Sequence, residues 1–151
     1  WGNNRGTKMK LIIGLDGHGS GERALTFGQN LAATMGSCEL LIVYVIEWSP
    51  FSFQTPEENA ERHKRREEEI SLAMERVITP ALEALKKAGM NAQGMVRHGN
   101  VADTLNAIAS DEKADQIIVG RTSEGAIASR IFGSVTANLV MHADVPVTVV
   151  A

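Results

Sequence analysis

The chain has 151 residues, of which 44% are apolar and 22% are charged, and its formal net charge at pH 7 is −3. This composition is that of an ordinary globular protein and excludes an intrinsically disordered one, and the length fits one domain better than two. A slightly negative chain offers no basic face to a polyanion. We therefore expect neither nucleic acid nor an anionic membrane among its partners.

Local composition supports the same view. The longest basic cluster, residues 62–66, has glutamates on both sides, which indicates a solvated helix face with internal ion pairs. The single cysteine, Cys38, cannot form an internal disulfide, and its place before an apolar run predicts a half-buried thiol. The sequence contains neither an 18-residue apolar segment nor a leader of the secretory kind, so cytoplasmic localisation is the expectation. Residues 1–8 are expected to be a disordered arm or a remnant of cloning ahead of Met9.

Five short apolar runs, rich in β-branched residues, alternate with segments of helical periodicity. The runs are continuous rather than alternating, which is typical of parallel strands buried between two layers of helices. They predict strands at Met9–Leu15, Leu40–Ile46, Ala92–Val96, Gln116–Val119 and Val145–Val150.

The helix after the second strand has a clear predicted start. Thr55 is followed by Pro56 and, three residues after itself, by Glu58, which is the pattern of a capping box with proline at the first helical position. The helical pattern continues to Lys87, and Pro80 is expected to bend or interrupt it.

Three other helices are expected. One begins near Ser20 and ends at a glycine cap, Gly36, another begins at Asn100, and the last begins at Gly133. The residues predicted to face the core are Ala24, Leu25, Gly28, Leu31, Ala32 and Met35 in the first, Val101, Leu105, Ile108 and Ala109 in the next, and Val135, Leu139 and Val140 in the last.

This order of elements predicts a single doubly wound α/β domain with a five-stranded parallel sheet and helices on both faces, of the Rossmann or flavodoxin-like type. Strand orders 2-1-3-4-5 and 3-2-1-4-5 are the usual outcomes, and we take 3-2-1-4-5 as the prediction. In that order the winding reverses between the first and fourth strands, so a ligand crevice opens at their carboxyl ends. Both glycine-rich loops, residues 14–21 and the one that starts at Gly120, follow these two strands. Their coincidence indicates a small-molecule site.

The segment from Gly120 to Thr136 has the features of a phosphate-binding loop that leads into a helix. Glycine lets backbone N–H groups approach an anion, and Ser134 and Thr136 add hydroxyl donors near a helix start, where the dipole is positive. Two residues separate Gly120 from Ser123, and nine more separate Ser123 from Gly133. This spacing resembles the Gly-x2-Gly-x9-Gly-Ser/Thr signature of the nucleotide-binding branch of the universal stress protein family, with serine in place of one glycine.

The resemblance runs from Met9 to Val150 and implies a universal stress protein domain over residues 9–151. Other matching pieces are Asp16-Gly17, Gly99, Ile118–Gly120, Gly133–Val135 and Ala143–Val149. By resemblance, Asp16 lies at the nucleoside end of the ligand, the backbone of Val45 meets the adenine, and the glycine-rich loop holds the phosphates. The candidate site residues are Leu15, Asp16, Val45, Gly120, Arg121, Ser123, Gly133, Ser134, Val135 and Thr136.

The expected ligand is ATP, bound either alone or together with Mg²⁺. Glu124 places a carboxylate close to the predicted phosphates, which it would repel unless Mg²⁺ or Arg121 intervened. Arg121 and Arg130 suit either of two roles, a fork of donors to phosphate or surface pairing with Glu124. The four histidines lack metal-ligand spacing, and no catalytic constellation is evident, so hydrolysis would at most be slow.

Three functions remain open at this point. The first is a cytoplasmic homodimer of the universal stress protein family that binds ATP or a related adenine nucleotide as a regulatory signal. In that family the final strand, here Val145–Val150, commonly pairs across a two-fold axis, and an apolar edge strand favours such pairing. The alternative is a family member that binds no nucleotide and acts as a dimeric protein–protein interaction module. An enzyme acting on a nucleotide is the third.

Overall fold

The computed structural model describes residues 8–17, 19–47, 55–121 and 135–151. Along the chain its elements are β1 (Met9–Leu15), α1 (Gly19–Met35), β2 (Cys38–Glu47), α2 (Pro56–Ala73), the π-helix η1 (Met74–Ile78), α3 (Thr79–Lys87), β3 (Asn91–Gly99), α4 (Val101–Asp111), β4 (Gln116–Gly120) and β5 (Val147–Val150). Residues 135–142 are also helical. The expected arm at residues 1–8 lies almost entirely outside the described ranges.

The strands form one five-stranded parallel sheet of order β3-β2-β1-β4-β5, so the predicted strand order is confirmed. β2 and β3 are longer than their apolar runs because they pair along their whole length, from Glu39 with Asn91 to Glu47 with Gly99. β5 starts two residues later than predicted, at Val147. Pro146 has no N–H to donate to a ladder, although its carbonyl accepts from the N–H of Ile117.

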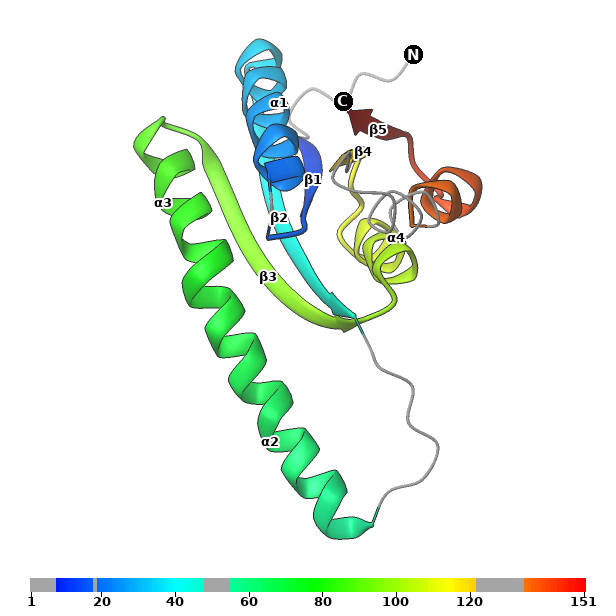
Figure 1. Cartoon of the computed structure of the whole chain (residues 1–151). Helices are drawn as coiled ribbons and strands as arrows, with labels where there is room; N and C mark the ends of the chain where they lie inside the picture. The colour runs from blue at the N-terminus through cyan, green and yellow to red at the C-terminus, as the bar shows by residue number, and fades with distance from the viewer. Residues whose placement is uncertain (1–7, 18, 48–54, 122–134) are drawn as a thin grey trace.

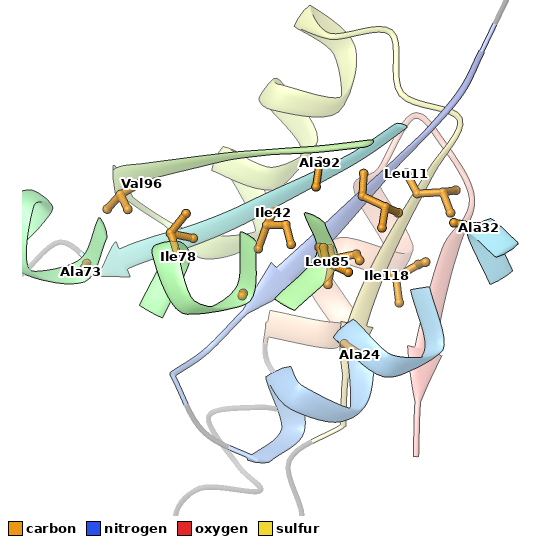
Figure 2. Close-up of a cluster of buried hydrophobic side chains, with 13 residues drawn as sticks. Leu11, Ala24, Ala32, Ile42, Ala73, Ile78, Leu85, Ala92, Val96 and Ile118 are labelled. Carbon is orange, nitrogen blue, oxygen red and sulfur yellow. The ribbon is translucent and has the colours of Figure 1, made fainter. Parts of the chain in front are cut away.

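Helices cover both faces of the sheet (Figure 1). The first face carries α1 and the rod formed by α2, η1 and α3, and the second carries α4 and the helix at residues 135–142. The buried side chains of the first face include Leu11, Ile13, Ala24, Ile42, Ile78, Leu85 and Ile118. Figure 2 shows the labelled members of this cluster between the strands and these helices. The buried side chains of the second face include Ile12, Val43, Leu105, Ile108, Ile117 and Leu139. Neighbouring residues of one strand thus enter opposite layers, which is why the apolar runs are continuous.

The long helical segment is interrupted as Pro80 predicted. Proline cannot donate to the preceding turn and its ring crowds the carbonyl four residues before it, and here η1 widens that turn immediately ahead of α3. The interruption packs closely on β3, because a Cβ added to Gly94 would lie 2.3 Å from Cγ2 of Ile78. Only glycine at this position lets the π-helix come so near the sheet.

The first half of α2 has little packing and extends beyond the sheet in Figure 1. The predicted capping box is present, because Thr55 Oγ1 accepts from the N–H of Glu58 at 3.1 Å while a Glu58 carboxylate oxygen accepts from the N–H of Thr55 at 3.1 Å. Ion pairs within the helix join Arg65 to Glu61 and His63 to Glu67. The basic cluster is therefore a solvated helix face, as the sequence indicated.

The inward faces of the other helices are largely as predicted. α1 ends at Met35, and Gly36 follows with φ of 80°, as a C-terminal glycine cap requires. In the helix at residues 135–142, however, the prediction for Val140 was wrong, since its side chain is 57% exposed while Leu139 is 1% exposed. Val135 and Leu139 lie four residues apart on one stripe, and Val140 is rotated about 100° from that stripe.

Cys38 is half-buried, as predicted, at the start of β2. Burial raises the pKa of its thiol, and the nearby carboxylates of Asp115 and Glu39 raise this pKa further. Within the described ranges, no helix is both long and apolar enough to cross a membrane.

Candidate nucleotide-binding site

The candidate site lies where the winding of the sheet reverses, at the carboxyl ends of β1 and β4. These neighbouring strands pair in parallel up to Gly14 with Val119. Beyond that pair, β1 leads through a short turn into α1, and Gly17 in this turn has φ of 77°. A positive φ is a conformation that glycine adopts without strain. The glycine of this loop is therefore required by the backbone, and it brings the first turn of α1 over the edge of the sheet.

Asp16 caps the start of α1. Its carboxylate accepts from the hydroxyl of Ser20 and, at 3.0 Å, from the backbone N–H of Gly21, so it satisfies donors that the first turn of a helix leaves without partners. The sequence placed Asp16 at the nucleoside end of a ligand. The structure puts it at the predicted edge, where it also has this structural task.

Gly120 is in van der Waals contact with the first turn of α1. A Cβ at this position would lie 2.0 Å from the backbone oxygen of Ser20 and 2.5 Å from its carbonyl carbon, both well inside normal contact. Any side chain would push α1 away from β4. The end of β4 and the start of α1 therefore meet at Gly120, and the contact is made by backbone against backbone.

Arg121 is held through its backbone. Its N–H donates to the carbonyl oxygen of Val150 at 2.6 Å, and its own carbonyl oxygen accepts from Nη2 of Arg23 at 2.6 Å. From the sequence, only the side chain of Arg121, which is exposed, was considered as a ligand group, and Arg23 was missed. An arginine one turn into a helix carries no pattern of its own. Its bond to the Arg121 carbonyl in the folded chain is the signal that identifies it.

Leu15 and Val45 lie on opposite faces of the sheet. Leu15 pairs with Tyr44 across the β1–β2 ladder and packs into the first face. Val45 is 8% exposed and belongs to the core of the second face. The side chains of these two predicted site residues therefore do not converge, and Val45 can reach a ligand only with its backbone.

Thr136, another predicted site residue, provides an unpaired polar group in the helix at residues 135–142. It lies in the first turn of the described helix, next to Val135, and both residues are half-buried. Its Oγ1 atom is buried and has no hydrogen-bond partner within the described part of the chain. Ser123, Gly133 and Ser134, like Glu124 and Arg130, lie outside the described residues.

A cleft lies beside this site, on the first face of the sheet. It has a volume of about 310 Å³ and lies between the start of α1 and the junction of η1 with α3. Its lining residues are Leu15, Gly17, Gly21, Glu22, Leu25, Arg76, Val77, Pro80, Ala81 and Ala84. Leu15 is thus part of this cleft rather than of a common surface with Val45.

The described residues contain no group of three or more histidine, cysteine, aspartate or glutamate side chains placed to hold a metal ion. The polar groups described at the carboxyl end of β1 are the Asp16 carboxylate and the donors it caps, the Ser20 hydroxyl and the Gly21 N–H. Such a set suits binding of a polar ligand.

The sheet order defines a doubly wound α/β domain in which the winding reverses between the first and fourth strands. The family model described as the universal stress protein family matches residues 9–151, and the chain belongs to that family. A curated relative, universal stress protein MT2052 of Mycobacterium tuberculosis, is 28% identical over 95% of this chain. Only 48% of that relative is covered, so the chain spans about half the length of the first curated relatives it matches.

Solved structures have the same fold. The universal stress protein UspA from Lactobacillus plantarum superposes with a TM-score of 0.74 at 21% identity, covering 96% of this chain and 99% of its own. A universal stress protein solved in complex with cAMP gives a TM-score of 0.61 at 25% identity, covering 95% and 96% of the two chains. An Arabidopsis thaliana family protein with AMP bound gives 0.63 at 15% identity, covering 94% and 90%.

Proposed function

We propose that this domain binds an adenine nucleotide, with ATP as the first candidate, at the carboxyl ends of β1 and β4, and that occupancy serves as a regulatory signal in a stress response. Similar proteins solved with cAMP and AMP support the class of ligand. The observation that carries the proposal for this chain is the hydroxyl of Thr136, which is buried without a partner in the described structure. A buried hydroxyl left without a hydrogen bond costs about 1–3 kcal/mol. A phosphate oxygen of a bound nucleotide would accept from it.

The surroundings of Thr136 favour an anion. In a parallel α/β sheet the helices run opposite to the strands, so the helix at residues 135–142 starts at the carboxyl edge. Its first N–H groups and its positive dipole end are suited to a phosphate. Gly120 adds a bare backbone at the same edge. Mg²⁺ would neutralise phosphate charge beside the predicted Glu124 carboxylate, and the described residues supply no cage for the ion.

Calorimetric titration of nucleotide-free protein with Mg·ATP, AMP and cAMP tests this proposal. Thr136→Val keeps the shape of the side chain and removes the unpaired hydroxyl. It should therefore leave the free energy of unfolding unchanged or raise it by about 1 kcal/mol, and weaken nucleotide binding about tenfold. Thr34→Val is the matched control, because Thr34 Oγ1 bonds to the carbonyl of Leu31 near the other end of α1. A folded wild type that gives no binding heat with any of the three nucleotides would overturn the proposal.

We also propose that two copies pair through the segment Val145–Val150. β5 is an edge strand of the sheet, and Val149 on it is an exposed apolar side chain, a combination that favours pairing with another strand. Sedimentation equilibrium of Val149→Lys should show a dimer dissociation constant raised at least about tenfold. Leu72→Lys, at an exposed apolar position on α2, is the control. Equal dimerisation of both variants would contradict this arrangement.

The alternative function is a protein–protein interaction module that binds no nucleotide. Val140 and Met141 favour it, because these adjacent apolar side chains are 57% and 76% exposed on one helix. The titration described above separates the two functions. An enzyme acting on a nucleotide would in addition release product above a buffer control.

A further inference from the structure

The first turns of α1 contact two consecutive residues at the end of β4. Ser20 lies against Gly120 through its backbone oxygen, and Arg23, three residues further along α1, donates to the carbonyl oxygen of Arg121. Residues three apart in a helix share one face. One face of α1 therefore makes both contacts.

We propose that Arg23 is a positioning residue of the nucleotide site, which fixes the backbone of Arg121 at the end of β4 and couples that residue to the edge strand β5. This inference rests on the nucleotide binding proposed above. Arg23 touches Arg121 rather than a ligand, and acts through the backbone of that residue.

The bond from Arg23 is of a strong kind. A guanidinium donor to a carbonyl oxygen is charge-assisted, and the distance of 2.6 Å between Nη2 and the oxygen is short. Arg23 is half-buried: its Nε atom is enclosed and has no hydrogen-bond partner in the described part of the chain, while the bond from Nη2 to Arg121 lies at the surface. A guanidinium held in this way has few alternative rotamers. It therefore restrains the Arg121 carbonyl more than a solvated lysine or arginine would.

The same residue is joined to the edge strand. The N–H of Arg121 donates to Val150, one step beyond the ladder pair of Gly120 with Val150. Any displacement of Arg121 toward a ligand must therefore stretch either the bond to α1 or the bond to β5. Because β5 is the strand through which dimerisation is proposed, nucleotide occupancy and the stability of this edge become linked.

Pre-organisation gives the physical benefit. Fixing the backbone of a residue when a ligand binds costs conformational entropy, and a residue whose backbone is already held by hydrogen bonds loses less. Removing the Arg23 bond should therefore weaken nucleotide binding and also loosen the end of the β4–β5 ladder. A purely structural role would change the second property alone.

The experiment uses Arg23→Gln, Arg23→Lys and the control Arg76→Gln, which removes the same charge from an exposed position on η1. Hydrogen exchange of the Arg121 amide, followed by NMR in the nucleotide-free protein, should accelerate about tenfold in Arg23→Gln and stay near the wild-type rate in the control. The dissociation constant for Mg·ATP should rise about fivefold to tenfold in Arg23→Gln, with partial rescue in Arg23→Lys.

Each outcome tests one part of the proposal, either the restraint on Arg121 or the positioning role in nucleotide binding. An unchanged exchange rate of the Arg121 amide in Arg23→Gln refutes the restraint, whether or not nucleotide binds. Faster exchange with unchanged nucleotide affinity refutes the positioning role and leaves a structural bond. If the wild type binds no nucleotide, the proposed function fails and the positioning role fails with it, while the exchange data still decide the restraint. Arg23→Lys supplies the same readouts if Arg23→Gln does not fold.

Discussion

Replacing Gly120 with alanine should be among the most damaging single-methyl additions in this chain. The new Cβ would lie 2.0 Å from the backbone oxygen of Ser20. Ordinary contact requires about 3.4 Å, so the start of α1 and the end of β4 would have to separate by about 1.4 Å. Neither partner is a flexible side chain that can rotate away, because both are backbone held in regular elements.

The expected cost lies at the upper end of the range for overpacked cores, about 3 kcal/mol. For a domain of this size each kcal/mol corresponds to roughly 2–4 °C in Tm, so Tm should fall by about 6–12 °C. Urea unfolding at fixed temperature should show a lower midpoint with an unchanged m-value. The carboxyl end of β4 would move as it separates from α1, so the hydrogen bond between Arg23 and Arg121 should weaken as well.

Gly36→Ala is the matched control. It adds the same methyl group at a position with φ of 80° and nothing within 4 Å of the new Cβ. Its cost is therefore backbone strain alone, about 1–2 kcal/mol. If Gly120→Ala lowers the free energy of unfolding no more than Gly36→Ala does, the close approach of α1 to β4 is refuted.

Three other predictions concern separate parts of the chain. Gly94→Ala should cost about 1–3 kcal/mol by clashing with Cγ2 of Ile78, and it should cost less in a chain that carries Ile78→Ala, which removes that methyl group; a fully additive double mutant by urea unfolding would argue against that contact. Thr55→Ala should cost about 1 kcal/mol by removing the capping box with Glu58, and unaltered thermal unfolding would count against it. Because its pKa is raised, the Cys38 thiol should react with iodoacetamide at pH 8 more slowly than a free cysteine does. Equal alkylation rates would contradict the burial of the thiol. The raised pKa of Cys38 also stabilises the folded state at neutral pH, and this stabilisation should decline as the pH rises past the pKa of the thiol in the unfolded chain.

Local sequence signals predicted much of the fold. The continuous apolar runs located the strands, Thr55 and Glu58 located the start of α2, and Pro80 marked the interruption of the long helical segment. These signals depend on residues close together in the chain, so one sequence contains them. The ends of β2 and β3 were predicted less well, because pairing with a strand distant in sequence decides how far each strand extends.

The site was predicted less completely because it depends on contacts between distant segments. The spacing of glycines identified Gly120 as important, but nothing local showed that Ser20 is the backbone it must accommodate. Arg23 had no pattern, since its partner is a carbonyl 98 residues away. Val140 was placed inward by counting apolar residues, whereas the helix turns Leu139 to the sheet instead.

The most direct test of a nucleotide site at the carboxyl edge is an NMR titration of ¹⁵N-labelled, nucleotide-free protein with Mg·ATP. Saturable shifts should appear at the amides of Asp16, Gly120, Arg121 and Thr136, while Lys10 and Asp115 at the opposite edge, which bond to each other, should stay unchanged. Shifts confined to the cleft between α1 and α3, or no saturable shift in a folded protein, would contradict the account.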